Sequence, residues 1–153
     1  MTLIYTHCHL HQPALFKNIE RVIENSLNND VERIVVPSVS PQHLNELIKI
    51  TQRFDLCSLA LGFHPFFADR VKDEDFKTLS LLLVEHDAVA VGEIGLDKFL
   101  NNIPLSTQEK ILKKQLEIAD NLELPIIVHA RGMIDPVSYT HLRAHETLMN
   151  PVC

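Results

Sequence analysis

Near-continuous apolar segments that alternate with amphipathic helical patterns predict an α/β fold built on a parallel sheet. Two further observations favour this fold class. Histidine and carboxylate side chains, which are typical of catalytic and metal sites, follow several of the apolar segments, as at the carboxyl edge of a parallel sheet. The 153 residues, 46% hydrophobic and 22% charged, also match a soluble globular domain with a substantial core.

The elements follow one another regularly along the chain. Apolar character predicts five strands, at 3–6, 33–36, 57–63, 88–91 and 124–128. Apolar residues at helical spacing predict the intervening helices: Leu15, Ile19, Val22, Ile23 and Leu27; then Leu44, Leu47 and Ile48; then Phe76, Leu79 and Leu83; then Leu112, Leu116, Ala119 and Leu122. Ser40 with Pro41 predicts the start of the second helix, and Ser106 with Glu109 predicts a capping box on the last.

Two parallel architectures fit this pattern, an open doubly wound sheet and a (β/α)8 barrel of the TIM type. No Gly-x-Gly-x-x-Gly loop follows a strand, which disfavours the dinucleotide-binding form of the open sheet. Barrels collect active-site residues at the carboxyl ends of several strands. A complete barrel needs about 250 residues, so we expect a barrel truncated to about five β/α units.

The first strand leads into His7 and His9, and this His-x-His pattern predicts a metal site. Residues two apart in an extended segment face the same side, so the two imidazoles can share one ion. Glu93 and His129 each follow a later apolar segment. Their recurrence at strand ends favours a metal centre over a chance pair of histidines.

Other residues have plainer interpretations. Cys8, between the two histidines, is expected to face away and pack as a small apolar residue. The remaining polar residues are expected on the surface: His11, His43 and His86, and a solvated helix face with Gln108, Lys113 and Lys114.

The composition of the chain limits its expected binding partners and cellular compartment. A net charge of −6 disfavours broad electrostatic capture of nucleic acid, although bound metal ions can reverse the potential within a site. No apolar run is long enough for a membrane span, and the start of the chain lacks a signal-type segment, so no membrane partner is expected. Three cysteines form no disulfide framework, which predicts a cytoplasmic protein.

The regular organisation, and with it the predicted domain of residues 1–135, ends near Asp135. Residues 136–147 have neither helical nor strand periodicity, and they resemble the in-frame translation of a transposase-type sequencing adapter. We therefore expect 136–153 to be a non-native tail. His141 and His145, although spaced like helical metal ligands, are not interpreted as a site.

Four motifs, in order and spacing, resemble those of the TatD family of metal-dependent hydrolases: Thr-His-Cys-His-Leu at 6–10, Gly-Phe-His-Pro at 62–65, Gly-Glu-Ile-Gly-Leu-Asp at 92–97 and Ile-Val-His-Ala-Arg at 127–131. The family consists of (β/α)8 proteins of the amidohydrolase type, several of them deoxyribonucleases. The resemblance covers residues 1 to about 135, which is the N-terminal half of such a protein.

The resemblance implies two divalent ions, Zn, Mg or Mn. His7 and His9 would hold the first, Glu93 would bridge both, and His129 would hold the second. His64 is a candidate catalytic contact to substrate phosphate, or alternatively a hydrogen-bond partner of a neighbouring loop. Arg131 is a candidate substrate phosphate clamp, and Asp97 is expected to orient the Glu93 loop or a ligand histidine.

The family also has a later histidine and an aspartate, which lie beyond residue 135, and usually an aspartate where His11 stands. The leading hypothesis is a two-metal phosphodiesterase, or deoxyribonuclease, acting on single-stranded or strand-end DNA, with the present chain inactive by itself. One alternative is an amidohydrolase-type enzyme for an ester or amide, such as an aminoacyl-ester deacylase. The other is a non-catalytic metal-binding protein.

Overall fold

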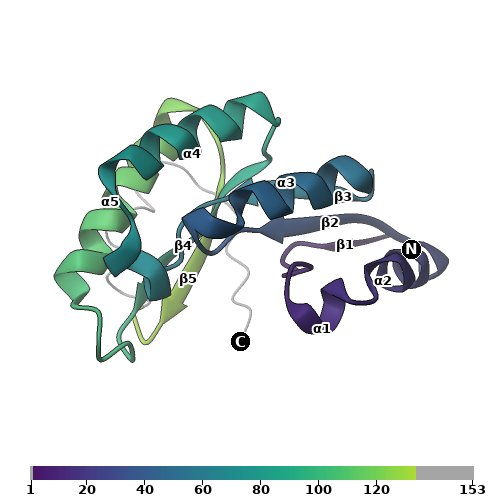
Figure 1. Cartoon of the computed structure of the whole chain (residues 1–153), viewed down its shortest axis with the longest axis horizontal. Helices are drawn as coiled ribbons and strands as arrows, with labels where there is room; N and C mark the ends of the chain where they lie inside the picture. Colours follow the sequence, from purple (N-terminus) through teal and green to yellow (C-terminus); the bar gives the residue numbers. More distant parts are fainter. Residues whose placement is uncertain (1, 134–153) are drawn as a thin grey trace.

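The computed structural model describes residues 2–133, and the predicted tail at 136–153 lies outside them. Five parallel strands form one sheet in the order β1-β2-β3-β4-β5 (Figure 1). Their bounds are β1 Leu3–Tyr5, β2 Val31–Pro37, β3 Cys57–Leu61, β4 Ala90–Asp97 and β5 Ile126–Arg131. The sequence prediction of a parallel α/β fold is therefore confirmed.

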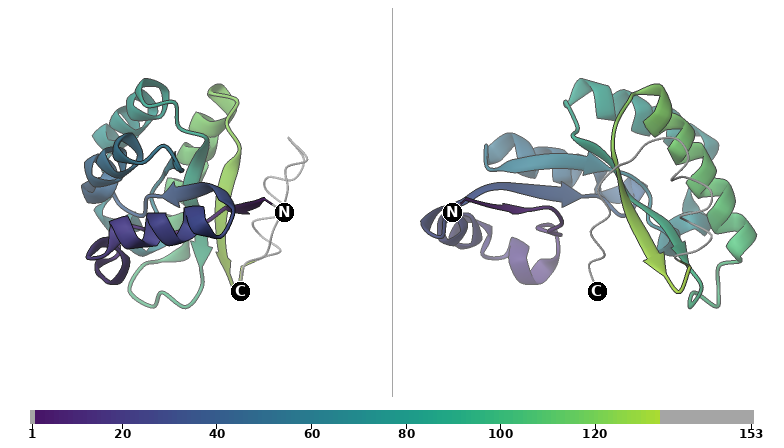
Figure 2. Two further views of the ribbon diagram at one scale, coloured as in Figure 1. Left: turned by 90° about the vertical axis from the view of Figure 1, so that its right-hand side faces the viewer. Right: turned by 180° about the vertical axis from the view of Figure 1, so that it is seen from behind.

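Helices connect the strands and lie on one side of the curled sheet, as the two further views in Figure 2 show. Their bounds are α1 Pro13–Phe16, α2 Ile19–Asn28, α3 Leu44–Arg53, α4 Asp73–Glu85 and α5 Leu105–Asn121, with 3-10 turns at Pro41–His43 and Pro65–Arg70. The core lies between the helices and the sheet, and includes Ile34, Leu47, Leu61, Leu79 and Ile94. Helices outside a curled parallel sheet form a half-barrel, as expected for about five β/α units.

Strands β4 and β5 pair over most of their length, from Val91 beside Ile126 to Asp97 beside Arg131. Gly95 makes this close pairing possible. Its φ is +152°, and a Cβ at this position would stand 1.8 Å from the carbonyl oxygen of His129. Only glycine leaves that space free, so Gly95 lets β5 approach β4 where the candidate site residues lie.

Two local predictions about helices are wrong and a third is confirmed in part. The first helical pattern is broken into α1 and α2, which are separate helices. Ser40 is the N-cap and Pro41 the first residue of the second helical segment, as predicted, but Pro41–His43 forms a 3-10 turn and the α-helix α3 begins at Leu44. Helix α5 begins at Leu105, directly after Pro104, so Ser106 lies inside its first turn and the predicted capping box does not form.

The predicted strand at 88–91 also differs from β4, which continues to Asp97. Glu93 therefore lies within a buried strand and not beyond its end. Among residues 2–133, no helix combines the length and the apolar character needed to cross a membrane.

Candidate metal centre

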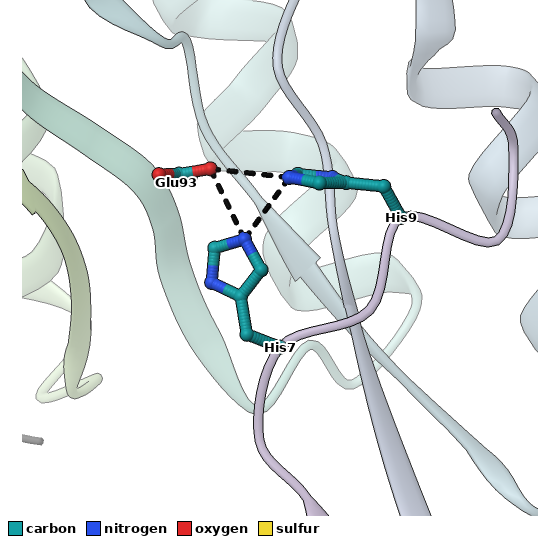
Figure 3. Close-up of side chains that lie close together, drawn as sticks. All are labelled: His7, His9 and Glu93. Atoms are coloured by element: carbon teal, nitrogen blue, oxygen red, sulfur yellow. Dashed lines mark hydrogen bonds and ion pairs between the residues drawn. The ribbon is translucent and has the colours of Figure 1, made fainter. Parts of the chain in front are cut away.

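His7 and His9 follow β1 and point toward Glu93 of β4 (Figure 3). The two Nε2 atoms are 3.0 Å apart. Each also lies close to the same carboxylate oxygen, Glu93 Oε2, at 3.2 Å from His7 and 3.3 Å from His9. Three potential ligand atoms thus form a small triangle.

The size of this triangle suits a divalent cation. Nitrogen and oxygen ligands at about 2.1 Å from one ion are about 3.0–3.4 Å from each other in octahedral or tetrahedral geometry. The three spacings of 3.0, 3.2 and 3.3 Å agree with that range. His7, His9 and Glu93 therefore fit one metal ion, although their role as ligands remains a prediction.

Backbone contacts fix the orientation of the His9 ring. Its Nδ1–H donates to the carbonyl oxygen of Pro37, at the end of β2, over 3.3 Å. The proton on Nδ1 leaves the Nε2 lone pair free for a metal ion. Cys8, between the histidines, packs against the core, and its N–H donates to Val35 O at 3.0 Å.

The other oxygen of Glu93 belongs to a second cluster. His129 Nδ1 lies 3.1 Å from Glu93 Oε1, and His129 Nε2 lies 3.2 Å from Asp97 Oδ2. If Nε2–H donates to Asp97, Nδ1 presents its lone pair toward Glu93. Such a carboxylate–histidine pair fixes the tautomer of a metal ligand in many proteins. Asp97 is thus placed to orient His129.

His64 completes the second cluster but differs from the other histidines. Its Nδ1 accepts the backbone N–H of Phe66 at 3.1 Å, and its Nε2 is 3.9 Å from Glu93 Oε1. A neutral ring in this arrangement carries its proton on Nε2 and is a hydrogen-bond donor. Burial lowers the pKa of His64 to about 4, so the ring stays neutral at physiological pH.

Glu93 and His129 stabilise each other's charged forms. Burial opposes ionisation of Glu93, but hydrogen bonds from His129, His7 and His9 outweigh it and hold the Glu93 pKa far below its usual range. Burial likewise disfavours the charged form of His129. Its hydrogen bonds to Glu93 and Asp97 prevail and raise its pKa. Glu93 is therefore an anion, as a bridging ligand must be.

Arg131, the last residue of β5, lies at the edge of this centre. Its Nη1 is 3.8 Å from Asp97 Oδ2, and most of its side chain is exposed. The structure thus gathers His7, His9, His64, Glu93, Asp97 and His129, and it places Arg131 beside them with its guanidinium accessible.

Two glutamines that support the centre were missed or misassigned. The prediction that Gln108 lies on a solvated face is wrong, because this residue is buried. Its Oε1 accepts the N–H of Asp97, and its Nε2 donates to the carbonyl oxygen of Asp97. Gln115 makes the same pair of bonds to Phe63, next to His64. Both glutamines recur at helical spacing with the apolar residues Leu112 and Ala119 and so lie on the same face of α5. This spacing could be read from the sequence.

The expectation that His11 lies on the surface is also wrong. The residue is 7% exposed, and neither ring nitrogen has a hydrogen-bond partner within the part of the chain that the structure describes. Burial, together with the neighbouring His9 and His43, lowers its pKa to about 4. His43 and His86 are half-buried, and His43 Nδ1 lies 3.0 Å from Ser40 Oγ.

Comparison with known proteins agrees with this geometry. The family model described as TatD related DNase matches residues 4–150. The metal-dependent hydrolase YabD of Bacillus subtilis, itself described as uncharacterized, is 31% identical over 135 residues, which is 88% of this chain and 53% of YabD. The 3'-5' ssDNA/RNA exonuclease TatD of Citrobacter koseri is 28% identical over 75% of this chain and 44% of its own length.

A solved structure, that of the TatD homologue YjjV from Escherichia coli, superposes with a TM-score of 0.86 at 29% identity. The match covers 92% of this chain and 55% of YjjV. The chain therefore spans about half the length of the relatives it matches.

Proposed function

The chain belongs to the TatD related DNase family, and we propose that it carries two half-sites of a two-metal centre that hydrolyses phosphodiester bonds in nucleic acid. The observation that supports this most is the position of Glu93. One of its oxygens faces His7 and His9, and the other faces His129. A carboxylate with an oxygen in each cluster suits a bridge between two cations about 3.5–4 Å apart.

Two divalent ions, when bound, supply Lewis acidity and an activated water for phosphodiester hydrolysis. His7, His9 and Glu93 would hold the first ion, and Glu93 and His129 the second. Asp97 keeps the His129 ring oriented. The choice among Zn, Mg and Mn stays open, because imidazole and carboxylate ligands suit all three to different degrees.

His64 and Arg131 would act on the substrate. The Nε2–H of neutral His64 can donate to a phosphoryl oxygen beside Glu93. The exposed guanidinium of Arg131 can hold a phosphate with two parallel hydrogen bonds. Neither residue needs to change protonation state to do so.

Single-stranded or strand-end nucleic acid is the proposed substrate. The relatives named as nucleases, including the 3'-5' ssDNA/RNA exonuclease, support this choice. We also propose a cytoplasmic setting, because both cysteines among residues 2–133, Cys8 and Cys57, are free thiols.

The test is a nuclease assay on the longer protein to which residues 1–135 are proposed to belong, with a labelled single-stranded oligonucleotide and Mn²⁺ or Mg²⁺. The expected result is metal-dependent release of nucleotides from one end, abolished by His9→Ala. Cleavage of an aminoacyl ester without cleavage of the oligonucleotide would favour the amidohydrolase-type alternative. Metal binding without either activity would favour the non-catalytic alternative.

A further inference from the structure

An exposed aromatic ring lies beside the candidate metal centre and has no part in the chemistry described above. Phe99 follows β4 and is 53% exposed. Two cations lie near its ring. The Arg131 guanidinium carbon is 5.0 Å from the ring centroid, and the Lys98 ammonium nitrogen is 5.6 Å from it. Phe99 thus combines an accessible ring with two positive charges within cation–π distance.

The ring is tied to the metal centre through Asp97. Asp97 Oδ1 accepts the backbone N–H of Phe99 at 2.9 Å. The other oxygen of this carboxylate lies 3.2 Å from His129 Nε2 and 3.8 Å from Arg131 Nη1. One buried carboxylate therefore sets the positions of the aromatic residue, the arginine and a candidate metal ligand relative to each other.

The end of β5 leaves room for this arrangement. A Cβ on Gly132 would stand 2.8 Å from Lys98 Cδ and 3.0 Å from Phe99 Cε2. Since glycine has no such atom, the phenylalanine ring and the lysine stem can pack beside the backbone that follows Arg131.

We propose that Phe99, flanked by Lys98 and Arg131, is a stacking platform for a nucleobase of single-stranded nucleic acid, which rests on the function proposed above. Every nucleobase has a π-face that can stack on the exposed part of an aromatic ring, and the two cations over the Phe99 ring suit the adjoining phosphates. A base inside a duplex is already stacked on its neighbours, so the platform favours a single strand or a frayed end. A base held on Phe99 would bring the phosphodiester backbone of its strand toward the metal centre.

The chain contains no tryptophan, so Phe99→Trp introduces one fluorophore at the proposed platform. The full chain, loaded with Mn²⁺, is titrated with a short oligothymidylate and with an abasic oligomer of the same number of phosphates. We expect the oligothymidylate to quench the tryptophan emission and the abasic oligomer to leave it unchanged. Phe16→Trp, at a comparably exposed phenylalanine on α1 (43%), is the matched control and should show no quenching.

Affinity, measured by anisotropy of labelled oligomers, gives a second readout. Phe99→Leu should weaken oligothymidylate binding by about fivefold or more, as expected for loss of one stacked base. The affinity for the abasic oligomer should be unchanged. Metal affinity should be unchanged too, because the hydrogen bond to Asp97 comes from the backbone of residue 99.

The outcomes separate the two proposals. If both oligomers bind equally well to the unsubstituted chain and Phe99→Leu changes neither, the platform is wrong and the proposed nuclease function stands. If neither oligomer binds the metal-loaded chain, the platform is wrong, and the nuclease assay described above decides the proposed function separately. A fall in metal affinity in Phe99→Leu would show a structural role and would also overturn the platform.

Discussion

The β1 end and the β4–β5 end of the sheet contribute to the same candidate centre, but the fold holds them differently. Strand β1 has three residues, all exposed, and His7 and His9 lie in the loop that follows it. Strand β4 has eight residues, all buried, and it contains both Glu93 and Asp97. One half-site is thus attached to an exposed edge, whereas the other takes its two carboxylates from a buried strand.

The contacts of the two half-sites follow the same division. The loop after β1 is anchored by the hydrogen bonds that the Cys8 N–H and the His9 ring donate to β2, and by the buried side chain of Leu10. On the other side, Gln108 holds the backbone of Asp97, which in turn contacts His129. This difference teaches that Glu93 is preorganised by the buried strand β4 and that His129, on the less buried strand β5, is oriented through Asp97, whereas the His-x-His pair depends on local contacts.

The largest expected effect is that of Gly95→Ala. The new Cβ would overlap the carbonyl oxygen of His129, at 1.8 Å, and would separate β4 from β5. We expect the free energy of unfolding to fall by about 4 kcal/mol or more, measured by urea denaturation. Gly132→Ala is the control, because its Cβ would meet side-chain atoms, the stem of Lys98 and the ring of Phe99, and no backbone of a paired strand. Gly132→Ala should lower the free energy of unfolding by about 1–2 kcal/mol. An equal loss in both variants would contradict the account of β4–β5 pairing.

The same truncation in each region gives the next largest effect. Ile94 in β4 is fully buried and Ile4 in β1 is 60% exposed. Ile94→Ala should lower the free energy of unfolding by about 2–5 kcal/mol, and Ile4→Ala should change it by less than about 0.5 kcal/mol. Similar losses in the two variants would remove the proposed contrast between edge and interior.

A smaller and more local effect is expected for Asp97→Asn. The asparagine keeps the shape of the side chain but weakens its hold on the His129 ring, so affinity for the second ion should fall about 10- to 100-fold. Affinity for the ion at His7 and His9 should stay unchanged, as followed by isothermal titration with Zn²⁺. Asp55→Asn, at an exposed position, is the control. An equal fall at both ions would mean that Asp97 does not act through His129 alone.

The sequence could predict the parallel fold because its signals are local and repeated. Apolar segments marked each strand, and helical spacing marked α3, α4 and α5. Convergence of residues as distant as His9 and Glu93 followed from the rule that parallel strands end at the same edge of a sheet. The positions of these side chains could thus be expected before their contacts were known.

Other features depend on tertiary contacts. Gln108 lies on the apolar face of α5, but a polar helix residue is usually solvated, and its burial depends on hydrogen bonds to the backbone of Asp97. His11 was expected on the surface for the same reason, and its burial follows from packing near His9 and His43. The contact between Phe99 and Arg131 joins the turn after β4 to the end of β5, so neither residue alone indicated it.

The central claim is that Glu93 bridges two ions, each also held by histidine from a different region. Its most direct test is a metal titration of the full chain with Zn²⁺ or Mn²⁺, followed by elemental analysis. His9→Ala should lose the first ion and His129→Ala the second, while Glu93→Ala should weaken both. His86→Ala is the control, since this half-buried histidine follows α4 outside the site. Unchanged stoichiometry and affinity in Glu93→Ala would contradict the bridge.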